Sequence, residues 1–373
     1  MLKNVLVIGG IEPTGRYLVK LLVESLDKGS HIRVVDRRLP SQALLRPEHI
    51  KVFEAVDFVQ ANMANPDTVE RVFTFPNNAS IDWVFNCSAA AHDWDVEEVL
   101  RQRYIVKPRL CAQHVMSHNV PVYVHLSTGC FYKDDGFRND ESRPLTPVTK
   151  IGQYVIDMEK ELASIPNLPM VLVRPAIPWG LDDFGLLPAM MVGSILHIQN
   201  DMEWLQPATP DIRYNLVHIN DVSRAMLHLA KWYEREGKTG TVIYNVAEKV
   251  DTNGGNGLAA VQAAYPKLKY KHIEADLSAR PTRADMEEVH RATNELLQEQ
   301  WFYYLSDEGI CNSSLIPSLN LEYCVFHSLA VDGRAIVRDT GFTYEHDDGF
   351  SGEDLRIMHR DFVDRGLWPK GSL

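Results

Sequence analysis

The stretch that decides the fold is "VLVIGGIEPTGRYLVKLL", residues 5–22, in which an apolar run ends at a glycine turn and a helical pattern follows. An unbroken apolar run is typical of a strand that is covered on both faces of its sheet. A strand, a tight glycine turn and a helix bring backbone close to the pyrophosphate of a nucleotide, which sits at the helix N-terminus. We therefore expect a nucleotide-binding turn at Gly9, Gly10 and Gly15.

Residues beside this turn bear on the identity of the ligand. A GxxGxxG pattern would have a glycine at Glu12, whose carboxylate faces a diphosphate unless it turns outward. Asp36 ends the next apolar run about 20 residues after the turn, where an acid binds the adenosine ribose and favours NAD. Arg37 and Arg38 follow it and suit a 2′-phosphate, so NADP stays open. A degenerate, empty site is the structural alternative.

The same alternation of apolar runs and helical patterns continues along the first half of the chain. "HIRVVDR", "DWVFNCSAA", "PVYVHLST" and "MVLVRPA" are strand-like, and helical stretches separate them. This order predicts an α/β fold with a doubly wound parallel sheet. We expect a dinucleotide-binding Rossmann domain over residues 1–180, to which 215–250 contribute. Residues 181–214 and 251–373 then form a smaller C-terminal substrate-binding domain with further helices.

Composition excludes several classes of protein. The 373 residues are 45% hydrophobic and 24% charged, as in globular proteins, and the net charge of −12 disfavours a nucleic-acid partner. The chain has no secretory signal pattern and no apolar stretch near the ~20 residues of a membrane span. Its five cysteines are odd in number and lack a CxxC pair, which indicates reduced thiols and no zinc site. We expect a cytoplasmic protein without a membrane, nucleic-acid or metal partner.

Several motifs, taken in order, resemble the extended short-chain dehydrogenase/reductase family, the NAD-dependent epimerase/dehydratase proteins. "ANMANPD" is similar to the segment that contacts adenine, and "VFNCSAAAHD" to the strand end beside the cofactor. "VRPAIPWG" is similar to the family's RpxnvYGP element, with Trp179 in place of tyrosine. The cofactor-contacting residues that the resemblance implies here are Asn62, Ala89, Ala90, Pro175 and Ile177.

Other motifs extend the resemblance to about residue 250. "VHLSTGCFY" is similar to the SSxxVYG strand and places Thr128 at the catalytic Ser/Thr, and "YNLVHINDVSRAM" places Asp221 at the acid of its segment. Two later segments, "MEWLQPATPDIRYNLVHINDV" and "VDGRAIVRDTGFTYEH", resemble a fungal branch of the family. The resemblance implies NAD or NADP as cofactor and a homodimer formed through helices.

The helix "TKIGQYVIDMEKEL", residues 149–162, departs from the family at its catalytic couple. Family members carry YGxSKxxxE there, in which the tyrosine exchanges a proton and the lysine holds the nicotinamide ribose. When the glycine and glutamate are aligned, Ile151 takes the tyrosine position and Val155 the lysine position. A register that uses Tyr154 puts Met158 where lysine is needed. No register restores the couple, which disfavours ordinary hydride-transfer chemistry.

Five residues are candidates to replace the missing couple, and each has an ordinary structural alternative. Thr128 can donate a hydrogen bond to a substrate oxygen. A buried carboxylic acid can act as a general acid, and a histidine titrates near neutral pH. The alternatives are helix packing for a tyrosine, a solvated loop for an aspartate and a surface loop for a histidine. The catalytic candidates are Thr128, Tyr154, Tyr132, Asp134 and His92.

The substrate side of the sequence is apolar. "FGLLPAMMVGSIL" and "MEWL" offer aliphatic and Met surface, which adapts to irregular apolar ligands. Between Gly180 and Met226 the basic residues other than histidine are Arg213 and Arg224, too few for a nucleotide-sugar diphosphate. The leading hypothesis is a redox-neutral enzyme that isomerises, cyclises, rearranges or eliminates from an apolar small molecule, with NAD(P) as a non-redox or vestigial ligand. The alternatives are an NAD(P)H-dependent oxidoreductase that uses Tyr154 and a non-catalytic dinucleotide sensor.

Overall fold

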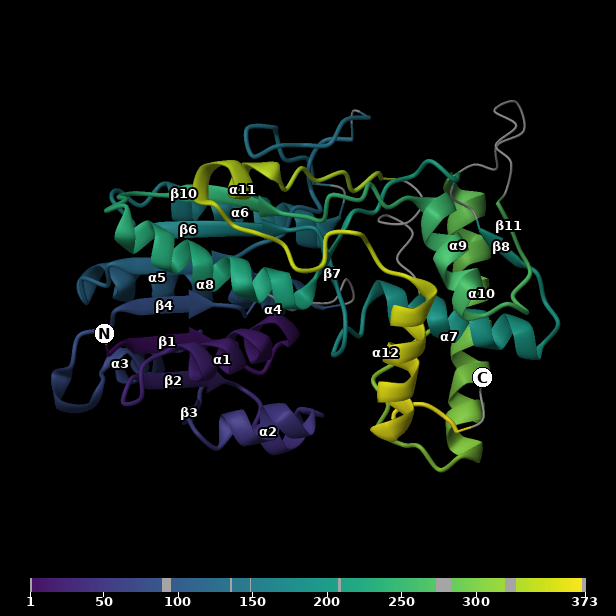
Figure 1. Ribbon diagram of the computed structural model, residues 1–373, viewed down its shortest axis with the longest axis horizontal. Helices are drawn as coiled ribbons and strands as arrows, with labels where there is room; N and C mark the ends of the chain where they lie inside the picture. The colour runs from purple at the N-terminus through teal and green to yellow at the C-terminus, as the bar shows by residue number, and fades with distance from the viewer. Residues whose placement is uncertain are drawn as a thin grey trace.

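The computed structural model describes residues 2–88, 95–134, 136–147, 149–206, 209–272, 283–318 and 327–370. Seven strands form its central sheet in the order β10-β6-β5-β4-β1-β2-β3, and every neighbouring pair is parallel (Figure 1). The strands are β1 (Asn4–Ile8), β2 (His31–Asp36), β3 (Asp57–Gln60), β4 (Trp83–Asn86), β5 (Val122–Leu126), β6 (Met170–Pro175) and β10 (Val242–Val246). The predicted doubly wound parallel sheet is confirmed.

Helices cover both faces of this sheet. One face packs against α1 (Pro13–Ser25), α8 (Ile219–Arg235) and α11 (Arg334–Thr340). The other packs against α3 (Pro66–Phe73), α5 (Lys107–Ser117) and α6 (Lys150–Ala163). The remaining helices of this half are α2 (Pro47–Phe53), α4 (Glu97–Arg101) and the short η1 (Pro40–Gln42), η2 (Pro76–Asn78) and η3 (Gln102–Val106).

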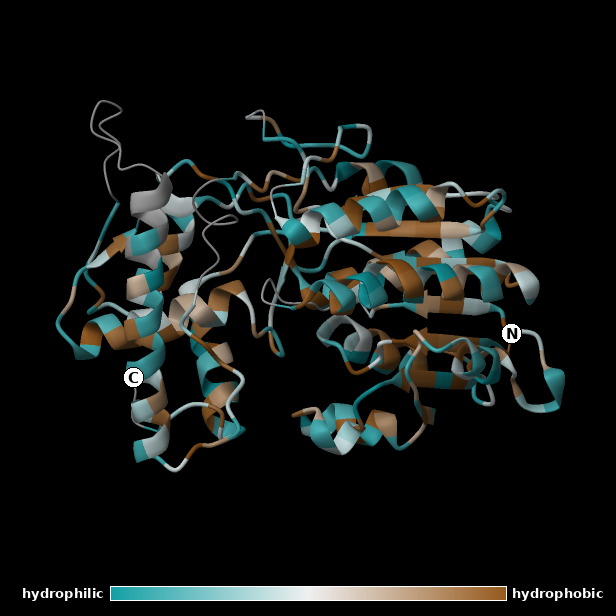
Figure 2. Cartoon of the chain, turned by 180° about the vertical axis from the view of Figure 1, so that it is seen from behind, coloured by the Kyte–Doolittle hydropathy of each residue, from teal (hydrophilic) through white to brown (hydrophobic). Residues whose placement is uncertain are grey.

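The strands are continuous apolar runs in the sequence because an apolar core packs against each face of the sheet. In β1, Val5 and Val7 belong to the core under α1 and α8, whereas Leu6 and Ile8 belong to the core under α5 and α6. Figure 2 shows the strands brown, the hydrophobic end of its scale, along most of their length. The first of these cores also contains residues from the far end of the chain, namely Val331, Ile336 and Phe342.

A second unit lies at one end of the sheet and has its own core (Figure 1). Two strand pairs, β8 with β11 and β7 with β9, are parallel and separate from the central sheet. The bounds of these elements are β7 (Ile177–Trp179), α7 (Leu186–Gln199), β8 (Trp204–Gln206), β9 (Leu216–His218), α9 (Gly254–Ala264), β11 (Tyr270–His272), α10 (Arg283–Asp307) and α12 (Gly352–Asp364). The division into domains at residues 180, 215 and 250 stays a prediction.

Helix α7 places most of the apolar segment "FGLLPAMMVGSIL" in a core and not on a substrate-facing surface. Residues 187–197 are all buried, and Met190 and Met191 are only 2% and 0% exposed. A helix that is apolar all round is a core helix, so this segment holds the second unit together. Among the described residues, no helix combines the length and apolar character that crossing a membrane requires.

The two units meet at a buried cluster of charges around Asp182. Its carboxylate lies 3.1 Å from Nη1 of Arg16 on α1 and 3.0 Å from Nη1 of Arg365, which follows α12. Nδ1 of His49 on α2 lies 3.3 Å from the other carboxylate oxygen. Burial by itself would raise the pKa of Asp182, but these partners lower it. Arg365 also donates to the carbonyl of Leu44 at 2.6 Å, so one carboxylate ties the last helix to the first quarter of the chain.

Candidate functional site

A small, open pocket lies where β1, β2, β3 and β4 end. In open α/β sheets, ligands bind at the carboxyl ends of the strands. The pocket brings together most of the glycine turn, the end of β2 and the start of α5, which are far apart in sequence. Its lining residues are Ile8, Gly9, Glu12, Val35, Asp36, Arg37, Ala61, Met63, Ser88, Arg103 and Lys107.

The glycine turn is built as its sequence predicts. Gly9 has a φ of 74°, and a Cβ on it would lie 2.7 Å from the backbone of Ser88. A Cβ on Gly15 would lie 2.2 Å from the carbonyl oxygen of Gly9. Gly10 instead packs on the second strand, since a Cβ there would lie 2.3 Å from Val34. Only glycine allows the strand, the turn and α1 to come this close together.

Asp36 and Arg37, two of the predicted cofactor contacts, line one end of the pocket, and Asn62 lies close to it. Asp36 is buried, and its carboxylate accepts backbone N–H groups from Ile11 at 3.3 Å and Arg38 at 3.1 Å. Arg37 lines the pocket beside it. Asn62 is exposed and accepts the N–H of Ala64 at 3.1 Å, between two residues that line the pocket. These groups fit an adenosine with its ribose.

The middle of the pocket carries two opposed charges. Glu12 lines it immediately before α1 and accepts a hydrogen bond from Nη2 of Arg38 at 3.2 Å. Burial raises the pKa of Glu12. Lys107, a residue that sequence reasoning missed, enters from α5 and donates to the carbonyl of Ser88 at 3.2 Å. Burial lowers the pKa of Lys107. A diphosphate fits the ammonium group but not an ionised carboxylate.

Helix α6 has no proton-exchanging group at the two family positions. Ile151 and Val155 are 9% and 3% exposed and belong to the apolar core under the sheet. The helix itself is well formed, since Thr149 caps it by accepting the N–H of Gly152 at 3.0 Å. The nicotinamide end of a bound dinucleotide would therefore find no lysine at either of these two positions.

Thr128 lies just beyond β5, beside Cys130. Its Oγ1 accepts the N–H of Cys130 at 3.1 Å, and its side chain also forms a hydrogen bond with the Cys130 thiol. The next residue, Gly129, donates its N–H to the carbonyl of Pro175 at 2.7 Å, so this loop is joined to the end of β6. Ile177 continues into β7 and donates to the carbonyl of Asn215 at 3.1 Å.

Tyr132 belongs to a buried polar network beneath this loop. Its hydroxyl donates to Asn245 at 2.7 Å and accepts from Arg174 at 2.9 Å, so its donor is used. Arg174 forms an ion pair with Glu159 of α6, and Ser127 also donates to Glu159. Sequence reasoning missed this network, although the Glu of the helix motif and the Arg of "VRPAIPWG" were its signal.

The other catalytic candidates are placed apart from the pocket or cannot be placed. The hydroxyl of Tyr154 donates to Glu97 on α4 at 3.3 Å, at the surface. Asp134 is exposed and accepts the N–H of Ser328 at 3.0 Å. His92, Ala89 and Ala90 lie outside the described residues.

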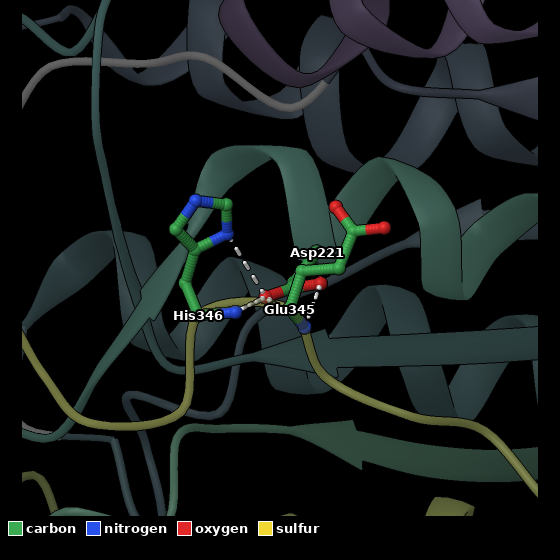
Figure 3. Close-up of side chains that lie close together, drawn as sticks. All are labelled: Asp221, Glu345 and His346. Atoms are coloured by element: carbon green, nitrogen blue, oxygen red, sulfur yellow. Dashed lines mark hydrogen bonds and ion pairs between the residues drawn. The ribbon is translucent and has the colours of Figure 1, made fainter.

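Asp221, Glu345 and His346 lie close enough together to suggest a metal site (Figure 3). The carboxylate of Asp221 already accepts the backbone N–H groups of Glu345 at 3.0 Å and His346 at 2.8 Å. Arg224 also forms ion pairs with Asp221 and Glu345. A guanidinium in the cluster repels a cation, so Asp221 serves to fasten the segment after α11 onto α8.

Glu248 follows β10 and is fully buried. Trp179, the residue that departs from the family's tyrosine, donates its Nε1–H to this carboxyl group. Burial raises the pKa of Glu248 to about 8. His218 stands against Trp179, with ring centroids 4.8 Å apart, and burial followed by the proximity of His346 lowers the pKa of His218 to about 4.

Replacing Glu248 with glutamine is expected to change the pH dependence of stability. A carboxyl pKa that is higher in the folded state stabilises the fold fully below the ordinary value of 4.5, and that contribution is lost as pH rises through about 8. Relative to wild type, the Glu248→Gln variant should therefore gain about 3–4 kcal/mol between about pH 5 and pH 8.5. Urea denaturation at both pH values measures this. Glu236→Gln, at an exposed site, is the control, and an equal gain there would refute the prediction.

Comparisons with known proteins agree with this architecture. The model of the family described as "NAD dependent epimerase/dehydratase family" matches residues 5–247. No curated protein sequence matches the chain. The structure is similar to a UDP-N-acetylglucosamine 4-epimerase from Methanobrevibacter ruminantium M1 in complex with UDP-N-acetylmuramic acid. Their TM-score is 0.66 at 16% identity, with 98% of this chain and 99% of that chain covered.

Two further solved structures have the same fold. A UDP-glucose-4-epimerase from Stenotrophomonas maltophila with bound NAD and formylated UDP-arabinopyranose gives a TM-score of 0.69 at 14% identity, covering 97% of this chain and 99% of that chain. The enzyme WbmH of Bordetella bronchiseptica, in complex with NAD+, gives 0.63 at 16% identity, covering 98% and 100%. Identities this low establish the fold alone. The resemblance inferred from the motifs is confirmed.

Proposed function

Because the chain belongs to the NAD-dependent epimerase/dehydratase family, we propose that it is an enzyme whose own reaction is redox-neutral. The reaction is an isomerisation, cyclisation, rearrangement or elimination of an apolar small molecule of specialised metabolism. One observation carries this proposal: α6 buries Ile151 and Val155 in an apolar core where family members place the proton-exchanging couple. Without a positioned acid, hydride transfer to a carbonyl forfeits about 100- to 10,000-fold in rate.

NAD or NADP is retained in this proposal as a non-redox or vestigial ligand. When bound in an enzyme, the nicotinamide exchanges a hydride with the substrate. Here Asp36 and Arg37 suit the adenosine end, which supports binding. Neither Ile151 nor Val155 has an atom that could hold the nicotinamide ribose, which argues against its use in the reaction.

The charges near the substrate side support a substrate without a diphosphate. Arg213 donates to Asp251 at 2.9 Å and to the carbonyl of Gly136 at 2.7 Å. Arg224 is paired with Asp221 and Glu345. Both arginines are thus already engaged, and the UDP-linked ligands of the similar structures would need a free cation. Thr128 is the residue we propose to donate a hydrogen bond to a substrate oxygen.

Two other functions remain as alternatives. An NAD(P)H-dependent oxidoreductase or epimerase is favoured by the epimerases among similar structures, but its acid, Tyr154, contacts Glu97 at the surface. A non-catalytic dinucleotide sensor would need only the pocket.

A homodimer and a cytoplasmic location stay predictions. The exposed faces of α5 and α6 are joined by the ion pair of Arg109 with Glu161, a polar contact that a dimer would have to accommodate.

Turnover without reduced cofactor is the expected result that tests this proposal. The purified chain is assayed by mass spectrometry against a panel of apolar ketones, enols and alcohols and against UDP-glucose, with and without NADH or NADPH. We expect product from an apolar compound, with unchanged mass or loss of water, and no need for added reduced cofactor. The Thr128→Val variant should be slower by about 100-fold or more, because a hydrogen-bond donor to the transition state is lost.

The Tyr154→Phe variant is the matched control, because it also removes one hydroxyl. It should retain activity within about twofold of wild type, because Tyr154 contacts Glu97 at the surface. Turnover that requires NADH and disappears in Tyr154→Phe would establish the oxidoreductase. NAD binding, seen as a rise in melting temperature, without turnover of any compound would favour the sensor.

A further inference from the structure

The pocket beside the glycine turn contains a carboxylate where a bound dinucleotide would place its diphosphate. Glu12 lines this pocket together with Gly9 and Ser88, and it stands directly before the first turn of α1. Backbone N–H groups at a helix N-terminus attract phosphate, whereas an ionised carboxylate repels it. The side chain of Glu12 is 22% exposed, so it lies partly within the pocket and partly at its mouth.

Lys107 supplies the opposite charge from another element. It comes from the first turn of α5, lines the same pocket and donates to the carbonyl of Ser88 at 3.2 Å. That carbonyl takes up only part of an ammonium group, which has three donors. Lys107 therefore has donors left for a ligand oxygen in the part of the pocket that Glu12 also lines.

We infer that Glu12 makes dinucleotide binding proton-linked: the diphosphate enters as the Glu12 carboxylate takes up one proton, and Lys107 holds the diphosphate. The inference rests on the proposed function, in which the pocket takes a dinucleotide. It concerns two charged residues, Glu12 and Lys107, at a site where a phosphate-binding glycine turn usually has no charged side chain. The ligand class is a dinucleotide, in which a diphosphate links two nucleosides.

The groups around Glu12 determine whether its pKa is raised or lowered, and therefore whether it takes up or releases a proton when the diphosphate binds. Burial raises the pKa of Glu12, and Asp36 adds to the rise, whereas Arg38, Lys107 and Arg16 oppose it. The Cys87 thiol, after β4, also lies near and stays neutral because burial raises its pKa. Arg38 forms the direct contact with Glu12, but its side chain is 45% exposed, and an ion pair in that setting is weak. Burial thus makes this carboxyl easier to protonate than an exposed glutamate, and a diphosphate beside it would raise its pKa further.

Affinity for NAD should consequently rise as pH falls. If binding requires one proton on Glu12, the dissociation constant increases by at most about tenfold for each pH unit above the pKa. Burial lowers the pKa of Lys107, so loss of its charge at high pH weakens binding in the same direction. Adenosine has no diphosphate, and its affinity should not change with pH.

Isothermal titration of the full chain with NAD and with adenosine tests the inference at about pH 6, 7 and 8. Two buffers of different ionisation enthalpy give the number of protons taken up. We expect proton uptake with NAD in wild type and a clearly smaller uptake in Glu12→Gln, in which only Lys107 can take up a proton. At pH 8 the Glu12→Gln variant should bind NAD about tenfold more tightly than wild type. Glu24→Gln, an exposed change at the other end of α1, is the matched control and should behave as wild type.

Variants of Lys107 test the second half of the inference. Lys107→Met keeps the apolar stem and should weaken NAD about tenfold while leaving adenosine unchanged, and Lys107→Arg should restore most of the loss. Circular dichroism confirms that each variant is folded. NAD binding that is independent of pH and unaffected by Glu12→Gln would overturn the inference alone and leave the proposed function standing. Failure of NAD to bind either wild type or Glu12→Gln at any pH would overturn both the inference and the retention of NAD.

Discussion

Replacing Asp182 with alanine is expected to lower the free energy of unfolding by about 3–5 kcal/mol, because the change removes the carboxylate from the buried Arg16 and leaves Arg365 with Asp361 alone. Arg16 has only 2% of its side chain exposed and Arg365 only 11%, and both point at this carboxylate. Neither guanidinium can lose its proton to escape the penalty. Urea denaturation followed by tryptophan fluorescence measures the loss, with far-UV circular dichroism to detect separate unfolding of the two units.

Asp201→Ala is the control for this prediction. Asp201 also forms an ion pair, with Lys269 at 2.6 Å, but 86% of its side chain is exposed. Removing an exposed pair should change stability by less than about 1 kcal/mol. A double variant, Arg16→Met with Asp182→Leu, should lose less than Asp182→Ala, since it removes a charge together with its partner. Equal losses in Asp182→Ala and Asp201→Ala would show that the buried cluster adds nothing to stability.

Introducing the family's lysine on α6 is expected to destabilise the protein by several kcal/mol. Val155 is 3% exposed and packed among apolar side chains, so the Val155→Lys variant must bury an ammonium group or open the core. We expect a loss of about 3–5 kcal/mol in the free energy of unfolding, as for other uncompensated buried charges. Denaturant unfolding at neutral pH measures it.

Gln153→Lys is the matched control, because Gln153 is exposed on the same helix. Its side-chain amide donates a hydrogen bond to Asp157 at 2.8 Å. That variant should be within about 0.5 kcal/mol of wild type. If Val155→Lys were as stable as Gln153→Lys, position 155 would open onto the pocket. The redox-neutral proposal would then lose the observation that carries it. Stabilisation of the Val155→Lys variant by added NAD would point the same way.

The sheet could be predicted from sequence because its signals are local. A glycine turn between an apolar run and a helical pattern needs only adjacent residues, and Gly9 and Gly15 leave no room for a side chain. The end of β2 could be predicted in the same way, since Asp36 is the polar residue that ends this apolar strand. These elements are specified by periodicity and backbone sterics, which a sequence displays.

The rest of the site depends on which way side chains point after packing. Tyr154 is a candidate acid three residues from Ile151, yet it contacts Glu97 because α4 lies beside that face. Lys107 has no motif, and only the placement of α5 against the glycine turn brings it to Glu12. The apolar pattern of α7 suits either a ligand-binding surface or a core, and the second unit surrounds it. Tertiary contacts decided all three.

Residues from both ends of the chain form one core, and this affects how the protein folds during its synthesis. Val331, Ile336 and Phe342 complete the core under α1 and α8, and Arg365 donates to the carbonyl of Leu44. A ribosome delivers these residues well after all seven strands have emerged. The nucleotide-binding half then cannot complete its core during its own synthesis. Part of its apolar surface stays uncovered until residues 331–342 have been released.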